Sequence, residues 1–304
     1  MTGNAQADAM LYSALAEKNK NCRYTLLNSI AESLKNSESL TDRAFASVCY
    51  ELNGESYAAL RNTLSLSSKA LENEAFFANT CIQLQRQNIE SAKESFRKAV
   101  DHLHKAKNYS ELGLLIKIQK SLLQKMHLPE NSYFNDIELP HILVIKSFTP
   151  FLTESFSDVQ LQTGQKKAAD LAPQTAHVLS CGSNMQELQM LEFFIRNGIK
   201  TTCVPPCPAS KLFSAAGEEI GGKIAAVYQQ SELLLPVTEY TPQTDIWHMT
   251  ENYSARYLLG LAILEREETE LPIVYIWSDH SNNFFHDDIK KICENNAICN
   301  HKIG

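Results

Sequence analysis

Hydrophobic and polar positions follow a helical period over the first part of the chain. In the segment 89–105, the apolar residues Ala92, Phe96, Val100 and Leu103 fall at i, i+4, i+8 and i+11 and form one stripe. The same period predicts seven helices, at 6–18, 23–34, 42–52, 55–68, 73–87, 89–105 and 109–124. The first part of the chain is therefore predicted to be entirely helical.

The breaks between these helices are short and polar. Thr41-Asp42, Asn88 and Asn108 each precede a new apolar rhythm and have the side chains that cap helix N-termini. The first 125 residues contain three glycines and no proline, so little in them interrupts a helix. Such helices, joined by short turns, predict stacked antiparallel hairpins similar to a tetratricopeptide array, with an irregular helical bundle as the alternative.

The pattern changes after a segment with two prolines and two asparagines, at 127–140. The run 141–145 (HILVI) is apolar and rich in branched residues, which is typical of a buried parallel strand. Further strands are predicted at 177–180, 200–204, 233–235 and 272–277. Helical patterns lie between and after them: one starts at Met185, and the others cover 209–229, 245–265 and 285–295. This alternation predicts a five-stranded, mainly parallel, Rossmann-like α/β domain. The predicted organisation is a helical domain at 1–126, a linker at 127–140 and the α/β domain at 141–304.

The composition of the chain argues against several classes of function. The formal net charge is −7, and the densest basic spots, Lys166-Lys167 and Lys290-Lys291, are dipeptides, which argues against a nucleic-acid partner. No apolar run reaches the length of a membrane span, and the N-terminus lacks the pattern of a signal peptide. The 8 cysteines are widely spaced, which indicates reduced thiols and predicts no metal site. These features predict a cytoplasmic protein.

In a doubly wound sheet, ligands bind beyond the carboxyl ends of the strands. At the end of the second predicted strand, Gly182 permits a tight turn, and Ser183 and Asn184 stand at the N-terminus of the next helix, where free N–H groups favour phosphate. The alternative is that Ser183 and Asn184 only cap that helix. The residues predicted to contact a ligand are Ser147, Ser180, Cys181, Gly182, Ser183, Asn184, Pro206, Thr238, Arg256 and Asp279.

Several segments of the α/β half occur in an order that resembles a known superfamily. They are VLSCGSN, GIKTTCVPP, LLLP, the run 253–262 and VYIWSD, and the resemblance extends over about 141–279. Their order and spacing are similar to the SLOG superfamily of Rossmann-like domains, whose members bind or process nucleotide-derived ligands. In bacterial signalling proteins such a domain follows a helical, TRAFs-binding-type region and often precedes a nucleotide cyclase. The resemblance implies a nucleotide-derived ligand.

The chain departs from the pattern of that superfamily at three places. Ser147-Phe148 stands where Gly-His is usual, and Asn184 where an aspartate is common. The segment 279–285 replaces a glycine-rich turn. Because glycines let the backbone approach a phosphate closely, their loss implies either a changed ligand or lost binding.

Three functions follow from these features. In the first, a signalling or sensor protein binds a nucleotide-derived small molecule through its α/β domain and a protein partner through its helical domain, and a homodimer is allowed. In the second, an enzyme hydrolyses a nucleotide or an N-glycosidic bond, with Glu187 or Asp279 as the acid or base. The alternative for Glu187 is a solvent-exposed position on its helix. The third is an interaction scaffold that has lost its ligand. A crevice filled by side chains at the strand ends would favour the scaffold.

Overall fold

The chain forms two compact units in a computed structural model, Met1–Glu138 and Leu139–Gly304. The structure describes residues 5–55, 58–59, 80, 83–84, 86–128, 133–149, 156–239, 246–279 and 287–303. Leu27 and Phe45 are fully buried in the first unit, and Leu143 and Val178 are fully buried in the second. Each unit therefore has a hydrophobic core of its own.

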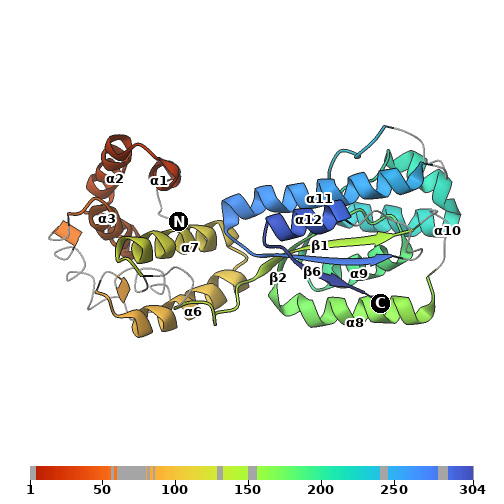
Figure 1. Cartoon of the computed structure of the whole chain (residues 1–304), viewed down its shortest axis with the longest axis horizontal. Helices are drawn as coiled ribbons and strands as arrows, with labels where there is room; N and C mark the ends of the chain where they lie inside the picture. Colours follow the sequence, from red (N-terminus) through yellow and green to blue (C-terminus); the bar gives the residue numbers. More distant parts are fainter. Residues whose placement is uncertain are drawn as a thin grey trace. The chain divides into compact units, whose positions relative to one another are not determined.

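The described part of the first unit is helical (Figure 1). Its helices are α1 (Ala5–Ala16), α2 (Lys20–Leu34), α3 (Leu40–Leu52), α6 (Ile89–Lys105) and α7 (Tyr109–Lys125). Helix α2 packs against α1 and α3, α6 packs against α7, and α7 also contacts α1 and α3. The helices predicted at 55–68 and 73–87 lie for the most part outside the described residues.

Side-chain caps define where these helices begin. Asn88 and Asn108 accept hydrogen bonds from backbone N–H groups in the first turns of α6 and α7, as predicted. Helix α3 differs, because Ser39 rather than Thr41-Asp42 is its N-cap and accepts from the Asp42 N–H at 3.3 Å. Asp42 lies inside the first turn instead, where its carboxylate interacts favourably with the helix dipole.

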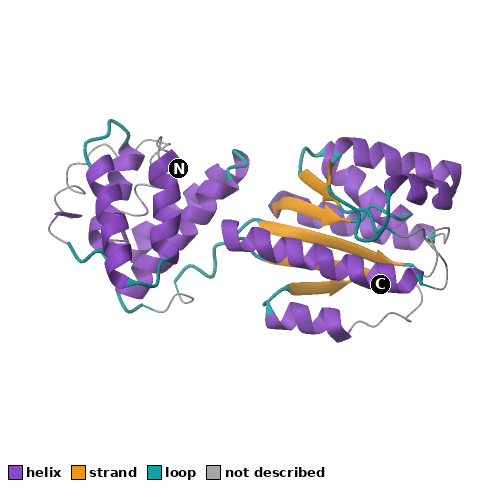
Figure 2. Ribbon diagram, turned by 90° about the horizontal axis from the view of Figure 1, so that it is seen from above, coloured by secondary structure: helices purple, strands orange, loops and turns teal. Residues whose placement is uncertain are grey.

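The second unit is a six-stranded parallel sheet covered by helices, so the predicted α/β class is confirmed but the predicted five strands are one too few (Figure 2). The strands are β1 (His141–Phe148), β2 (Thr175–Ser180), β3 (Lys200–Cys203), β4 (Glu232–Leu233), β5 (Ile273–Asp279) and β6 (Cys299–Lys302). The helices are α8 (Asp158–Leu171), α9 (Met185–Arg196), α10 (Ala209–Gln230), α11 (Trp247–Thr269) and α12 (Asp287–Asn295), with a short 3₁₀ turn at Ala172–Gln174. The missed strand, β6, is polar and exposed along its length, and it belongs to the sheet through its backbone pairing with β5.

The order of the strands is β4-β3-β2-β1-β5-β6, and every pair is parallel. The chain moves from β1 towards β4 on one side, and then returns to place β5 and β6 on the other side of β1. The order therefore reverses between β1 and β5, and this is where such sheets bind ligands. Ser147 of β1 is paired with Ser278 of β5 at this point.

The two faces of β1 carry different side chains, because successive residues of a strand point to opposite faces. Leu143 and Ile145 share a core cluster with residues of α9, including Leu188 and Leu191. The residues between them point towards α11, which packs on β1 and β5. Figure 1 shows α8 and α11 on opposite faces of the sheet. One of the side chains on the α11 face of β1 is Lys146, a charged residue in an otherwise apolar run.

Candidate functional site

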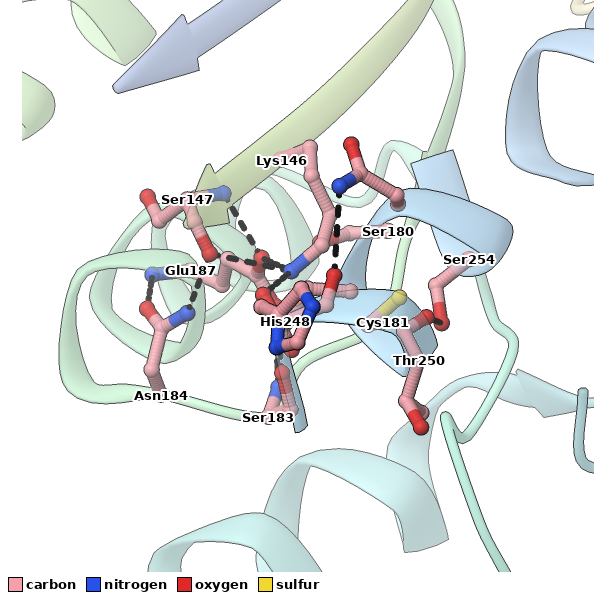
Figure 3. A network of polar contacts seen from close by, with 12 residues as sticks. Lys146, Ser147, Ser180, Cys181, Ser183, Asn184, Glu187, His248, Thr250 and Ser254 are labelled. Carbon is pink, nitrogen blue, oxygen red and sulfur yellow. Dashed lines mark hydrogen bonds and ion pairs between the residues drawn. The ribbon is translucent and has the colours of Figure 1, made fainter. Parts of the chain in front are cut away.

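The carboxyl ends of β1 and β2 bring together most of the residues predicted to contact a ligand (Figure 3). The residues gathered there are Ser147, Ser180, Cys181, Gly182, Ser183 and Asn184, and all of them are buried. Two charged side chains within this group, Lys146 and Glu187, are fully buried as well. The loop that was predicted to contact a ligand is part of a dense, buried polar core in the structure.

Lys146 is the centre of this core. Its Nζ donates hydrogen bonds to Oε1 of Glu187 at 2.9 Å, to Oε2 of Glu251 at 2.5 Å and to the Ser147 carbonyl at 2.9 Å. Glu187 comes from the first turn of α9 and Glu251 from α11, so the ammonium joins two helices to β1. We refer to Lys146, Glu187 and Glu251 as the Lys146 cluster. All three side chains have an exposed fraction of 0%.

Both carboxylate oxygens of Glu187 are engaged. Oε1 accepts from Lys146 Nζ and from the Ser147 backbone N–H at 2.8 Å. Oε2 accepts from the Ser183 N–H at 2.9 Å and the Ser183 hydroxyl at 3.2 Å. A carboxylate with four donors is well compensated for burial. Glu187 therefore connects the end of β1 to the start of α9, and its proton-accepting positions are already occupied.

Several donors of the loop 180–184 are used within the protein. The Gly182 N–H donates to Ser180 Oγ at 3.4 Å and the Ser183 N–H donates to Glu187. Asn184 is the N-cap of α9, accepts from the Glu187 N–H at 3.1 Å, and donates to the Ser147 carbonyl at 3.0 Å. The carboxylate of Glu187 thus lies at the helix N-terminus, where an external phosphate would be expected.

Glu251 differs from Glu187 in how well its charge is compensated. Burial raises the pKa of Glu251 from 4.5 to about 7, although the Lys146 ammonium and the Thr149 backbone N–H act in the opposite direction. Its Oε1 makes no hydrogen bond of ordinary geometry in the described structure. For Lys146, burial opposes the charge, but Glu187 and Glu251 outweigh it and raise the pKa of Lys146 above its usual value. Burial therefore raises the pKa of Glu251 in spite of its contact with Lys146.

A second polar group lies at the point where the strand order reverses. Ser147 Oγ donates to Gln186 Oε1 at 2.6 Å, and Ser278 Oγ contacts both Ser147 Oγ at 2.8 Å and the same amide oxygen. Gln186 Nε2 donates to the Gln160 carbonyl in α8 at 3.0 Å. Ser147, a predicted ligand contact, thus forms hydrogen bonds with other side chains of the protein through both its backbone and its hydroxyl.

The thiol of Cys181 is adjacent to the Lys146 cluster. Burial raises the pKa of Cys181 well above its usual value, although Lys146 lowers it. Its carbonyl accepts a hydrogen bond from the Tyr228 hydroxyl at 2.7 Å. A fully buried thiol with a raised pKa is a small apolar residue rather than a nucleophile.

The remaining predicted residues lie elsewhere. Thr238 donates to the Pro206 carbonyl through its hydroxyl at 3.1 Å and its N–H at 3.3 Å, which closes the loop after β4 onto the end of β3. Arg256 forms an ion pair with Asp288 of α12 at 2.6 Å. Asp279 is the last residue of β5, half-buried and in register with Phe148.

The sequence interpretation missed Lys146, Gln186 and Glu251. Lys146 had a signal, because a lysine inside an apolar run that is buried on both faces requires a buried carboxylate partner. Glu251 had no local signal, since it lies on a helical pattern with other acidic and polar residues.

Comparison of the chain with models of known protein families and with curated proteins finds no match. Within the described residues, no three side chains of the metal-ligating types gather into one group. In the same part of the chain, no helix combines the length and the hydropathy needed to cross a bilayer. The site is therefore interpreted from its own geometry.

Proposed function

We propose that the protein is a cytoplasmic interaction protein of the signalling kind. Its helical unit binds a protein partner, and its α/β unit is a SLOG-type module that no longer accepts a nucleotide phosphate on the loop 180–184. The observation that carries this proposal is the Glu187 carboxylate, which has four donors of its own at the N-terminus of α9. The filled strand ends support the scaffold function over the nucleotide sensor and over the enzyme.

The argument is electrostatic as well as steric. A phosphate at a helix N-terminus needs free N–H groups and a positive field. Here Glu187 uses the Ser183 N–H, and two carboxylates share the single ammonium of Lys146. A phosphate placed beside this cluster would meet a buried carboxylate, and like charges interact strongly where water is excluded. The cluster that replaces the phosphate therefore also repels it.

The geometry of the Lys146 cluster does not support the enzyme alternative. An acid or base must exchange a proton with a substrate atom within hydrogen-bond reach. Glu187 is fully buried and both of its oxygens are bonded within the protein. Asp279 is more exposed, but it lies outside the Lys146 cluster.

Nucleotide titration tests the proposal. Both tryptophans, Trp247 and Trp277, lie in the α/β unit, so tryptophan fluorescence follows the unfolding of that unit alone. We expect ATP, NAD, ADP-ribose and cyclic nucleotides at millimolar concentration to leave its melting temperature unchanged. A saturable increase of several degrees with any of them would contradict the proposal, because a ligand that binds the folded state stabilises it.

A second candidate function is a sensor that binds a nucleoside through its neutral part. It is favoured by two buried polar atoms on one face of α11, one helical turn apart. Trp247 Nε1 and Glu251 Oε1 make no hydrogen bond of ordinary geometry with the described residues. A ribose hydroxyl can donate to a carboxylate, as in dinucleotide-binding folds. Adenosine and ribose are the probes, and stabilisation that is lost in Glu251→Gln and kept in Asn252→Ala would support this candidate.

A further inference from the structure

A groove of about 480 Å³ lies on the helical unit. It is formed by the start of α2, the end of α3 and the end of α7, and its walls include Lys20, Arg23, Tyr24, Asn53, Gln124 and Lys125. Its volume is within the usual range for ligand pockets. The described residues that line it include three cations and no carboxylate, although the chain as a whole has a net charge of −7.

The cations at the start of α2 interact unfavourably with the helix dipole. Lys20 and Arg23 lie in its first turn, which contains no acidic residue. Positive side chains are unfavourable at a helix N-terminus, where the free N–H groups already carry positive charge. Among the described residues, neither side chain forms an ion pair. The Asn19 side chain caps two N–H groups of this turn, but no described carboxylate forms an ion pair with Lys20 or Arg23.

Among the other charged groups near the groove, Lys125 forms an ion pair, whereas the carboxylates of Glu55 and Glu17 accept hydrogen bonds from neutral donors and keep their charge. Lys125 pairs with Glu51 at 2.9 Å. Glu55 accepts from the Tyr24 hydroxyl at 2.9 Å, and Glu17 accepts from the Asn19 N–H at 2.7 Å. Tyr24 is 49% exposed, so it also offers an aromatic wall to a bound chain. Lys20 and Arg23 are thus the cations available to an incoming anion.

We propose that this groove binds an acidic peptide segment of a partner protein. Carboxylates of the segment would pair with Lys20 and Arg23, and the N-terminus of α2 adds a favourable field for the same charges. The Tyr24 ring would pack against the apolar parts of the segment. This inference rests on the proposed function, since it identifies the chemistry of the partner that the helical unit binds.

Fluorescence anisotropy of the full chain with two labelled probes tests the groove. The probes are a fluorescein-labelled octaglutamate peptide and its octaglutamine counterpart. We expect the octaglutamate to bind, the octaglutamine to bind at least tenfold more weakly, and the affinity for octaglutamate to fall with added salt because exposed charges are screened. Equal affinity for both peptides, or none for either, would overturn the proposal.

A pair of double variants locates the binding. Lys20→Gln with Arg23→Gln removes two positive charges from the groove, and we expect it to weaken octaglutamate binding at least tenfold. Lys166→Gln with Lys167→Gln removes the same charge from α8 in the other unit, and we expect less than a twofold change. Circular dichroism of each variant checks that it is folded. Equal effects of the two double variants would overturn the groove as the binding site and would indicate that overall charge attracts the peptide.

Further outcomes separate this inference from the proposed function. An octauridylate RNA that binds more tightly than octaglutamate through Lys20 and Arg23 would overturn the peptide as occupant. Concentration-dependent association of the chain that octaglutamate does not displace, and that needs the same cations, would assign the groove to a second copy and also overturn it. Stabilisation of the α/β unit by nucleotides contradicts the proposed function alone, because tryptophan fluorescence does not report on the helical unit.

Discussion

The Lys146 cluster and the groove at the start of α2 both concentrate charge, but they treat it in opposite ways. Lys146 is fully buried and contacts two carboxylates within 3 Å, at 2.9 Å and 2.5 Å. Lys20 and Arg23 are accessible at the start of α2 and have no carboxylate partner among the described residues. The first region encloses its charges within the protein, whereas the second leaves them available to solvent and to a partner.

This difference separates structural charge from charge that can recognise a partner. A buried ion is tolerated only when protein groups replace its water, so its partners are part of the fold. An exposed ion costs little to keep and can exchange water for a ligand. The polar residues at the strand ends, which the Rossmann-like fold suggests as a ligand site, belong to the first kind. The cations of the helical unit belong to the second.

The largest expected effect is the loss of the central cation. Lys146→Met leaves Glu187 and Glu251 buried without their ammonium, and we expect the α/β unit to lose about 3–5 kcal/mol of unfolding free energy. Urea unfolding followed by tryptophan fluorescence measures this unit. Lys166→Met, on the exposed face of α8, is the control and should change stability by less than about 0.5 kcal/mol. A loss below about 1 kcal/mol for Lys146→Met would show that its ion pairs are not structural.

Titration of Glu251 gives the next largest effect. Its pKa in the folded protein is about 7, above its usual 4.5, so the folded state binds this proton more tightly than the unfolded state. The resulting stabilisation is fully present below pH 4.5 and is lost as the pH rises through 7, by up to about 3 kcal/mol. Glu251→Gln has no proton to lose, so its stability between pH 5 and 8 should decline less steeply than that of the wild type. Parallel urea-midpoint profiles for the two proteins would refute this assignment.

A smaller effect is expected at the turn before α9. Gly182 has a φ of +58°, and a methyl group there would lie 3.1 Å from a Leu191 side-chain carbon and 3.2 Å from a Tyr228 ring carbon. We expect Gly182→Ala to destabilise the α/β unit by about 1–3 kcal/mol, from backbone strain and overpacking. Gly222→Ala is the matched control, because its methyl group would meet nothing within 4 Å and alanine favours a helix. The two variants should therefore shift the urea midpoint in opposite directions.

The smallest effect concerns the stability of the helical unit. Replacing Lys20 and Arg23 with glutamine removes positive charge from the N-terminus of α2, and the unit should gain up to about 0.5 kcal/mol. Thermal unfolding followed by circular dichroism at 222 nm reports on the helices of both units, and tryptophan fluorescence identifies the transition of the α/β unit. A loss above about 1 kcal/mol would mean that these cations are structural, and the contrast with Lys146 would fail.

Local features of the sequence were sufficient for much of the fold. The segment 89–105 was predicted as one helix, and α6 has the same bounds. The caps Asn88 and Asn108 were predicted because a cap bonds to N–H groups only two or three residues away. Buried strands were recognised from apolar runs such as 141–145, although β1 continues to Phe148.

Elements that lack a local signal were missed. The segment of α8 was not identified as a helix, since only Gly164 and Ala168 of it are buried and its apolar stripe is weak. Strand β6 is polar and fully exposed, so nothing in its own residues distinguishes it from a loop. Its pairing with β5 depends on backbone groups that every sequence has.

The sequence by itself determined the order of helices and strands, the helical and α/β halves, and the loop 180–184 at a strand end. Only the tertiary structure decided that protein side chains fill the space beside this loop. Lys146 contacts Glu187 and Glu251, which lie 41 and 105 residues further along the chain. The strand order and the packing of α9 and α11 bring these groups together, and no local pattern encodes that distance. The physical reason is that burial requires compensation of charge, and the compensating partner is chosen by topology.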